Sequence, residues 1–270
     1  MALTRLRSSL LALALSFAAA PAFGAACGND GSGFDAWIAD FQKDAAAQGI
    51  SKGALSALNG LTYDKKVIAA DRNQKQFKQS FEQFSGRMIP PRVKRAKGML
   101  QTHAATLARI EQKYGVPGEV VIAIWGLETD FGAVKGKSST LRSLATLAYD
   151  CRRGDFFTGQ LMDALQIIDR GDLSAEQMRG GLHGELGQTQ FLPSSYIAFA
   201  VDFDGNGKRD LLSSATDVLG STASYLKGYG WQPGQPWTEG TSNFQVIKAW
   251  NKSQVYSQTV AEFARQLSEG

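Results

Sequence analysis

The chain has 270 residues, 43% of them hydrophobic and 20% charged, with a formal net charge of +4. A chain of this length can bury a substantial core, and we expect one domain with a smaller lobe. The mild charge does not indicate a nucleic-acid-binding protein. The sequence contains only two histidines, His103 and His183, which excludes a histidine-rich metal site, and it has neither of the glycine-rich phosphate-binding motifs.

Residues 1–25 have the layout of a secretory signal peptide. Arg5 and Arg7 precede an apolar stretch from Leu10 to Ala20, and small residues follow that stretch. The apolar stretch is too short to span a bilayer as a helix. We therefore expect an exported protein whose first residues are removed, which lowers its net charge to about +2.

The segment around the cleavage site also contains one of the two cysteines. Cleavage follows either Ala22 or Ala25, since small residues precede both sites. A lipid anchor at Cys27 is disfavoured, because Gly24 stands where lipoprotein signals usually carry an apolar residue. In an exported protein two cysteines favour one disulfide, so we predict a bridge between Cys27 and Cys151. Two unpaired thiols are the alternative.

Apolar residues at helical spacing dominate the rest of the chain and predict a mainly α-helical fold. The four clearest stripes are Phe34/Trp37/Ile38/Phe41, Phe77/Phe81/Phe84, Leu100/His103/Leu107/Ile110/Tyr114 and Phe157/Leu161/Leu165/Ile168. Pro117 and Pro193 can each open a further helix, and Ser174 with Gln177 matches a capping box. The best strand-like run is Phe244–Ala249.

The most informative segment is Val120–Gly132, in which Glu128 closes a long apolar run. Ionising a carboxyl group beside apolar walls is costly, so we expect the pKa of Glu128 to be raised. A carboxyl group that stays protonated near neutral pH can act as a general acid. Glu128 is therefore our first candidate for a catalytic residue.

Asp202 begins an acidic loop with the spacing of an EF-hand calcium site. Asp202, Asp204 and Asn206 occupy positions 1, 3 and 5, and Lys208 offers a backbone carbonyl at position 7. We add Asp210 as a further candidate ligand. Because a serine replaces the usual glutamate at position 12, we expect weaker or altered binding of a structural Ca²⁺ ion. A tight turn without an ion is the alternative.

A second polar segment, Gly184–Tyr196, alternates polar side chains with glycines and then enters a short helix. Its residues Gln188, Gln190, Ser194 and Ser195 are candidates to line a sugar-binding groove, or else belong to a plain loop with a helix cap. Aromatic side chains that could stack on sugar rings are Trp125, Trp231, Trp237, Trp250, Tyr225 and Tyr229. Together with the candidate acid, these residues predict a carbohydrate-binding cleft.

Six motifs then occur in an order known from one enzyme family. They are GVPGEVVIAIWGLETDFG (115–132), SLATLAYDCRR (143–153), GELGQTQFLPSSY (184–196), VDFDGNGKRDL (201–211), STASYLKGYGW (221–231) and VIKAWNKSQVY (246–256). From about Phe34 to the C-terminus, this ordered set strongly resembles the lytic murein transglycosylases of the membrane-bound B type, glycoside hydrolase family 103. Any one motif alone would be weak, whereas the ordered set is highly specific.

The resemblance implies a lysozyme-like, goose-type helical domain over residues 26–270, with a small irregular or β lobe at about 201–215 that holds the calcium loop. It implies a periplasmic enzyme that cleaves the β-1,4 bond between N-acetylmuramic acid and N-acetylglucosamine without water and leaves 1,6-anhydro ends. No cofactor takes part in that chemistry. We expect a monomer that acts on peptidoglycan glycan strands, with other cell-wall enzymes as candidate partners and no separate C-terminal peptidoglycan-binding domain.

The same resemblance implies roles for individual residues, with Glu128 as the single acid and base. Residues that match polar or aromatic groups of the family's cleft are Gln190, Ser194 or Ser195, Tyr225 and Asn251. Residues that match the family's calcium loop are Asp202, Asp204, Asn206 and the carbonyl of Lys208. The residue before the cleft asparagine is usually tyrosine and is Trp250 here, which keeps a stacking surface but loses a hydroxyl group.

Two other activities stay open at the level of the sequence. A muramidase that uses water would need a second carboxylate, for which Asp130 and Glu185 are the candidates. Asp130 lies two positions from Glu128 and would point away from it on a helix, so Glu185 is the stronger candidate. A non-catalytic wall-binding protein is the second alternative, which the presence of Glu128 disfavours.

Overall fold

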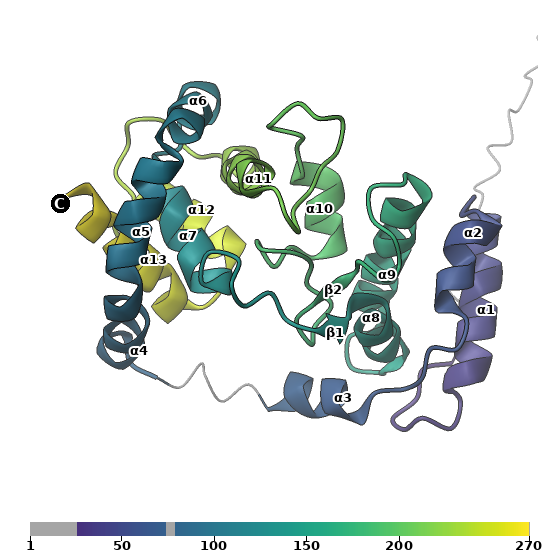
Figure 1. Cartoon of the computed structure of the whole chain (residues 1–270). Coiled ribbons are helices and arrows are strands. Elements are labelled where there is room, and N and C mark those ends of the chain that lie inside the picture. The colour runs from purple at the N-terminus through teal and green to yellow at the C-terminus, as the bar shows by residue number, and fades with distance from the viewer. Residues whose placement is uncertain (1–25, 74–78, 270) are drawn as a thin grey trace, which may run out of the picture.

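The computed structural model describes residues 26–73 and 79–269, so the predicted signal peptide and Phe77 lie outside the described residues. The described residues are mostly helical, which confirms the predicted mainly α fold (Figure 1). The elements are α1 (Phe34–Ala47), α2 (Lys52–Leu55), the 3₁₀ helix η1 (Ser56–Leu58), α3 (Lys65–Arg72), α4 (Phe81–Met88), α5 (Pro90–Thr102), α6 (Ala104–Tyr114), α7 (Gly118–Thr129), β1 (Ser138–Ser139), α8 (Thr140–Tyr149), α9 (Gly154–Asp169), β2 (Arg179–Gly180), α10 (Pro193–Phe199), α11 (Ala215–Gly228), α12 (Ser242–Trp250) and α13 (Gln254–Ser268). Within the described ranges no helix is long and apolar enough to cross a membrane.

Helix α7 is the central element of one group of helices, which also contains α4–α6 and α11–α13 (Figure 1). Its residues Val120–Trp125 are all buried, as expected for a helix that is apolar on every face. A Cβ atom at Gly126 would lie 2.7 Å from the ring of Phe131, so only glycine fits there without a shift. The carbonyl of Gly126 accepts a hydrogen bond of 2.9 Å from the guanidinium of Arg92 on α5. This close packing fixes the end of α7, which carries Glu128.

A second group of helices comprises α1–α3, α8 and α9, and α10 lies between the two groups (Figure 1). Helix α8 packs along α9, and α10 contacts both α9 and α11. The short strands β1 and β2 pair antiparallel, with Ser138 opposite Gly180. Although α8 and α9 separate the two strands in the chain, this pairing joins the loop after α7 to the loop that precedes α10.

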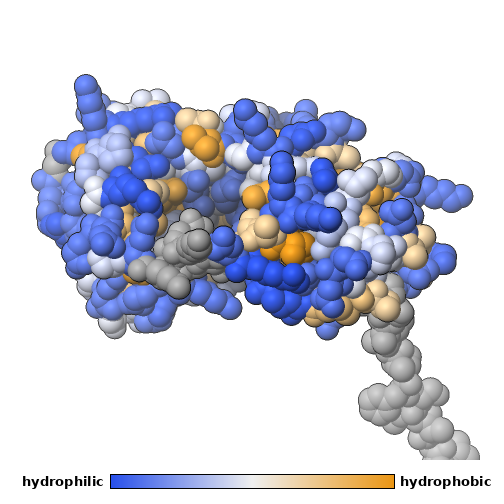
Figure 2. Space-filling model, turned by 90° about the horizontal axis from the view of Figure 1, so that it is seen from below, coloured by the Kyte–Doolittle hydropathy of each residue, from blue (hydrophilic) through white to orange (hydrophobic). Residues whose placement is uncertain are grey.

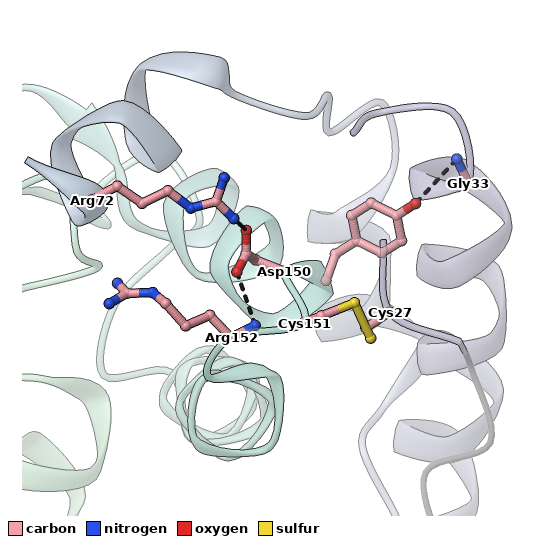
Figure 3. Close-up of a disulfide and its surroundings, with 7 residues drawn as sticks. Cys27, Gly33, Arg72, Asp150, Cys151 and Arg152 are labelled. Atoms are coloured by element: carbon pink, nitrogen blue, oxygen red, sulfur yellow. Dashed lines mark hydrogen bonds and ion pairs between the residues drawn. A yellow bond between two sulfur atoms is a disulfide. The ribbon is translucent and has the colours of Figure 1, made fainter. Parts of the chain in front are cut away.

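The structure contains a disulfide between Cys27 and Cys151, which ties the start of the described chain to the turn between α8 and α9 (Figure 3). The backbone N–H of Gly28 donates to the carbonyl of Tyr149 at 3.0 Å, and that of Gly33 donates to the Tyr149 hydroxyl at 3.2 Å. The N-terminal segment is thus held by one covalent bond and by hydrogen bonds on either side of it.

Two buried aspartates stabilise the same turn. Asp150 pairs with Arg72 of α3 at 2.5 Å and accepts the backbone N–H of Arg152 at 3.0 Å (Figure 3). Asp71 forms ion pairs with both Arg152 and Arg153. Because a buried carboxylate is costly unless it is paired, these contacts hold α3 against the start of α9, where one wall of the candidate site begins.

The structure corrects the predicted strand at Phe244–Ala249, which belongs to helix α12. Thr241 caps this helix, since its side chain accepts the backbone N–H of Phe244. Phe244 and Ile247 are three residues apart and both buried, so a helix buries them on one face. A short apolar run fits a strand or a helix equally well by spacing alone, and here packing against α11 and α13 decided the outcome.

Two further local predictions need correction. Gln177 does accept the backbone N–H of Ser174 at 2.8 Å, but the segment is a turn before β2 and not a helix. The stripe from Leu100 to Tyr114 is divided at His103, where α5 ends and α6 begins. The half-buried ring of His103 lies 5.7 Å from that of Trp125.

Candidate active site

Glu128 lies in the last turn of α7, at a sharp reversal of the chain. Asp130 and Phe131 adopt φ values of 51° and 54°, which are uncommon for residues with a side chain, so the chain turns back directly after Thr129. The ring of Phe131 then packs edge-on against Trp125, with 5.6 Å between ring centres. This reversal leaves the half-buried carboxyl group of Glu128 beside open space instead of a following helical turn.

Two side chains donate hydrogen bonds to the same oxygen of Glu128. The hydroxyl of Tyr256, on α13, lies 2.6 Å from Oε1, and the indole Nε1 of Trp250 lies 2.8 Å from it. An indole N–H can only donate, so Oε1 is an acceptor whether or not the carboxyl group is ionised. The proton of neutral Glu128 therefore resides on Oε2.

The surroundings raise the pKa of Glu128 from 4.5 to about 6. Burial is the largest cause, because it disfavours the charged form. The hydrogen bonds from Tyr256 and Trp250 lower the pKa, since they stabilise the carboxylate, and the nearby charge of Glu185 raises it. The balance allows Glu128 to give up and regain a proton near neutral pH.

Trp250 is held in place by aromatic side chains behind it. Its ring centre lies 4.8 Å from that of Tyr225 and 5.3 Å from that of Phe191. Tyr225 is buried, and its hydroxyl donates to the carbonyl of Ala249 at 2.8 Å. The structure thus corrects the assignment of Tyr225 as a sugar contact, because it places this tyrosine behind Trp250.

Two cavities meet at Glu128. The larger, of about 1010 Å³, is lined by the end of α3, the start of α9, the loop after β2 and the residues Asn251 and Lys252. The smaller, of about 370 Å³, is lined by α4 and by the start of α13. Glu128 and Asn251 line both cavities, so the carboxyl group of Glu128 is accessible from each of them.

The linings of the two cavities mix polar and apolar side chains. Figure 2 shows a face dominated by hydrophilic residues, with hydrophobic residues in small separate patches. Among the described residues, the large hydrophobic side chains that are exposed are Val134, Phe156 and Tyr229, and Phe156 lines the larger cavity. A cavity that offers hydrogen-bonding side chains together with the exposed ring of Phe156 suits a carbohydrate, which has hydroxyl groups at its edge and an apolar face.

Gln188 lies away from both cavities, which corrects its assignment as a groove residue. It is buried, its Oε1 accepts from the indole of Trp125 at 3.0 Å, and its Nε2 donates to the carbonyl of Leu212 at 3.0 Å. Its own carbonyl accepts from the hydroxyl of Thr129 at 2.8 Å. Gln188 therefore connects α7 to the 201–215 lobe.

The other polar residues predicted in this segment are half-buried around the start of α10 and do not line the two cavities described above. Gln190 has a φ of 51°, and its Nε2 donates to the carbonyl of Gly187 at 2.7 Å. The backbone N–H of Ser194 donates to Gln160 at 3.1 Å. For Gln190, Ser194 and Ser195, a sugar contact stays a prediction.

The two candidates for a second carboxylate lie in different places. Asp130 faces Arg92 and Arg95, with ion-pair distances of 3.7 and 3.4 Å, and does not line the cavities at Glu128. Glu185 lines the larger cavity together with Glu128. Its Oε2 accepts the backbone N–H of His183 at 3.0 Å.

Three carboxylates gather in the 201–215 lobe and at the start of α11. Oxygens of Asp202, Asp204 and Asp217 all lie within 4.8 Å of one another. The buried Asp217 also accepts the backbone N–H groups of Phe203 and Asp210, at 2.7 and 2.8 Å. Hard oxygen donors at this spacing fit Ca²⁺ or Mg²⁺.

The predicted ligand set therefore changes. Asp217 joins Asp202 and Asp204 in the cluster, whereas Asp210 does not; its Oδ1 accepts the backbone N–H groups of Leu212 and Ser213, at 2.9 and 2.8 Å, and its role as a ligand stays a prediction. The side-chain oxygen of Asn206 accepts the backbone N–H of Lys208 at 2.9 Å. The roles of Asn206 and of the Lys208 carbonyl as ligands stay predictions.

Sequence reasoning missed Tyr256, Asp217 and the contact of His183 with Glu185. Tyr256 closes one of the quoted motifs, which was a usable signal. Asp217 lies beyond position 12 of the EF-hand spacing. Its place three residues after Ser214 also fits an ordinary helix cap, and the side chain of Ser214 does accept its backbone N–H. His183 carried no signal beyond its place in a glycine-rich turn.

The helical fold with an acid at the meeting point of two cavities defines a lysozyme-like domain. The family model described as the Transglycosylase SLT domain matches residues 33–241, and the chain belongs to this family.

Individual relatives agree with the family and the fold. The chain is 37% identical over 148 residues to membrane-bound lytic murein transglycosylase B of Escherichia coli (strain K12), a match that covers 54% of this chain and only 41% of that protein. The structure of SltB3 from Pseudomonas aeruginosa in complex with NAG-anhNAM-pentapeptide is 33% identical, with a TM-score of 0.82 over 89% of this chain and 80% of that one. SltB1 from the same organism is 26% identical, with a TM-score of 0.80 over 86% and 98%.

Proposed function

We propose that the protein is a periplasmic lytic transglycosylase that cleaves the β-1,4 bond between N-acetylmuramic acid and N-acetylglucosamine in peptidoglycan and leaves 1,6-anhydro ends. The observation that supports this most directly is the environment of Glu128, whose pKa is raised to about 6 beside two open cavities. The similarity to SltB3, which was solved with a peptidoglycan fragment, supports the choice of substrate.

In the first step, protonated Glu128 gives its Oε2 proton to the glycosidic oxygen. The bond from that oxygen to the anomeric carbon breaks, and the 2-acetamido group of the substrate stabilises the positive sugar. The carboxylate left on Glu128 is stabilised by the hydrogen bonds from Tyr256 and Trp250 to Oε1.

In the second step, Glu128 removes the proton of the 6-hydroxyl group, whose oxygen bonds to the anomeric carbon. The acid is thereby regenerated, and one carboxyl group serves both steps. A pKa of about 6 suits both roles, because neither protonation state is strongly disfavoured near neutral pH.

We further propose that the carboxylates of Asp202, Asp204 and Asp217 hold a structural Ca²⁺ ion. A structure of Escherichia coli lytic transglycosylase Slt35 in complex with calcium shares this fold, at 23% identity and a TM-score of 0.78, over 90% of this chain and 96% of that one. Location in the periplasm agrees with the disulfide, since disulfides persist in oxidising compartments. The thiol of Cys27 is used in that disulfide, which opposes a lipid anchor at this residue.

The proposal is tested by mass spectrometry of purified peptidoglycan digested with the unmodified protein, Glu128→Gln or Asp130→Asn. We expect anhydromuropeptides from the unmodified protein and from Asp130→Asn, and none from Glu128→Gln. Asp130→Asn is a matched control, because it removes a nearby carboxylate that lies outside the cavities, and asparagine tolerates a positive φ. If Glu128→Gln still released these products, Glu128 would not be the acid.

A further inference from the structure

A second carboxyl group, that of Glu185, shares the larger cavity with Glu128. Glu185 lies in the loop between β2 and α10, and its side chain is 25% exposed. The cavity of about 1010 Å³ that both residues line has room for water beside a bound sugar. The mechanism proposed above uses only Glu128 and gives Glu185 no task.

The local backbone makes room for the Glu185 carboxylate. A Cβ atom at Gly181 would lie 2.3 Å from Oε2 of Glu185, so any larger residue at position 181 would push this carboxylate away. Gly181 also lines the cavity. The absence of a side chain at Gly181 thus allows Glu185 to reach this place.

His183 holds the carboxylate from the other side. Its backbone N–H donates to Oε2 at 3.0 Å, and its Nδ1 lies 3.5 Å from Oε1. In the part of the chain that the structure describes, Nε2 of His183 has no hydrogen-bond partner. The polar contacts of His183 are therefore directed at Glu185, and they fix its orientation.

The pKa values of the two carboxyl groups are shifted in opposite directions. Burial pushes the pKa of Glu185 upward, but hydrogen bonds from His183 and from the backbone outweigh burial and bring it below its usual value. Burial raises the pKa of Glu128, and the charge of Glu185 raises it further. Hydrolysis of a glycosidic bond commonly uses one carboxyl group that is readily protonated and one that stays ionised, and this cavity contains such a pair.

We propose that Glu185, oriented by His183, is a general base that activates water and gives this enzyme a second, hydrolytic outcome at the same bond. Glu128 protonates the glycosidic oxygen and that bond breaks, as before. Glu185 then takes a proton from a water molecule, whose oxygen bonds to the anomeric carbon, and the product is a reducing-end muramic acid. Water and the 6-hydroxyl group thus compete for one intermediate. The inference rests on the proposed function, because both outcomes begin with the same proton transfer.

The test measures the ratio of reducing-end to anhydro products. Peptidoglycan is first reduced with borohydride, so that every new reducing end arises from the enzyme, and the digests are analysed by mass spectrometry. The variants are Glu185→Gln, which keeps an acceptor for the N–H of His183, and Glu128→Gln, with Asp130→Asn as the control. Thermal unfolding of each variant establishes that it is folded.

We expect both product types from the unmodified protein and an unchanged ratio from Asp130→Asn. Glu185→Gln should lower the ratio by about tenfold or more, since a positioned base contributes at least that much, while the anhydro product persists. A wild-type digest with only anhydro ends, or an unchanged ratio in Glu185→Gln, would overturn the inference and leave the proposed function standing. If the unmodified protein released only reducing-end products and Glu185→Gln released none, the transglycosylase proposal would be overturned and the role of Glu185 supported. No product at all would overturn both.

Discussion

Replacing Glu128 by glutamine should make the protein inactive and, above pH 6, more stable. Ionisation of this half-buried carboxyl group destabilises the folded state, because folding raises its pKa from 4.5 to about 6. Glutamine is neutral at every pH and has nearly the same shape. Its carbonyl oxygen can accept the same hydrogen bonds from Trp250 and Tyr256.

The size of the effect follows from the pKa difference. Each unit of pKa difference corresponds to about 1.4 kcal/mol, so ionised Glu128 lowers the free energy of unfolding by up to about 2 kcal/mol. The folded protein binds the proton more tightly than the unfolded chain, so stability falls as pH rises from 4.5 to about 6 and is level beyond that. The gain from Glu128→Gln is therefore near zero at pH 4 and reaches up to about 2 kcal/mol at pH 7.5. For a chain of this size, that is roughly 4–8 °C in Tm.

The assay is urea unfolding of both proteins at pH 4 and pH 7.5, with the folded state followed by circular dichroism. Asp130→Asn is again the control, because its carboxylate is paired with arginines at the surface. A Glu128→Gln variant that gains no more stability at pH 7.5 than at pH 4 would refute the reasoning, since the carboxyl group would then cost nothing when ionised.

Three further predictions concern the surroundings of Glu128 and the two stabilising features of the fold. Trp250→Phe removes an N–H donor to Glu128 but keeps an aromatic ring, so the pKa of Glu128 should rise and the alkaline limb of kcat/KM should move up by about one pH unit. The indole of Trp237 donates to a backbone carbonyl instead, so Trp237→Phe should leave the alkaline limb of kcat/KM unchanged. Equal shifts of this limb in the two variants would contradict the argument. Removing the disulfide with Cys27→Ser and Cys151→Ser should lower the free energy of unfolding by about 2–4 kcal/mol, because the bond closes a loop with a sequence separation of 124. Urea unfolding measures this difference. A difference near zero would mean that the hydrogen bonds alone hold the N-terminal segment. Calcium should raise Tm and a chelator should lower it, and Asp217→Asn should abolish this response; a Tm that ignores the chelator argues against the ion.

Features that depend on neighbouring residues could be predicted from the sequence. An apolar stripe such as Phe157 to Ile168 must be buried whatever covers it, so α9 was predicted correctly. Glu128 was identified because it closes a long apolar run, and such a run is expected to be buried. Asp202 and Asp204 were predicted to share an ion because oxygens two residues apart in one loop can approach each other, and oxygens of the two residues do lie within 4.8 Å.

Features that depend on contacts between distant segments could not be predicted in this way. A short apolar run such as Phe244–Ala249 has no preference of its own, so its partners α11 and α13 made it a helix. Nothing in the spacing around Gln188 shows whether its amide faces a groove or bridges two segments. Its burial against Trp125 and Leu212 depends on how three parts of the chain meet.

The sequence by itself therefore determined the helical fold class, the candidate acid and the position of the acidic loop, because each depends on local spacing and composition. Only the tertiary structure decided which groups surround the acid. Trp250 and Tyr256 lie 122 and 128 positions after Glu128, yet both donate to its Oε1. Hydrogen bonds and burial set the pKa of a carboxyl group, and they depend on distances in space, which separation along the chain does not reveal.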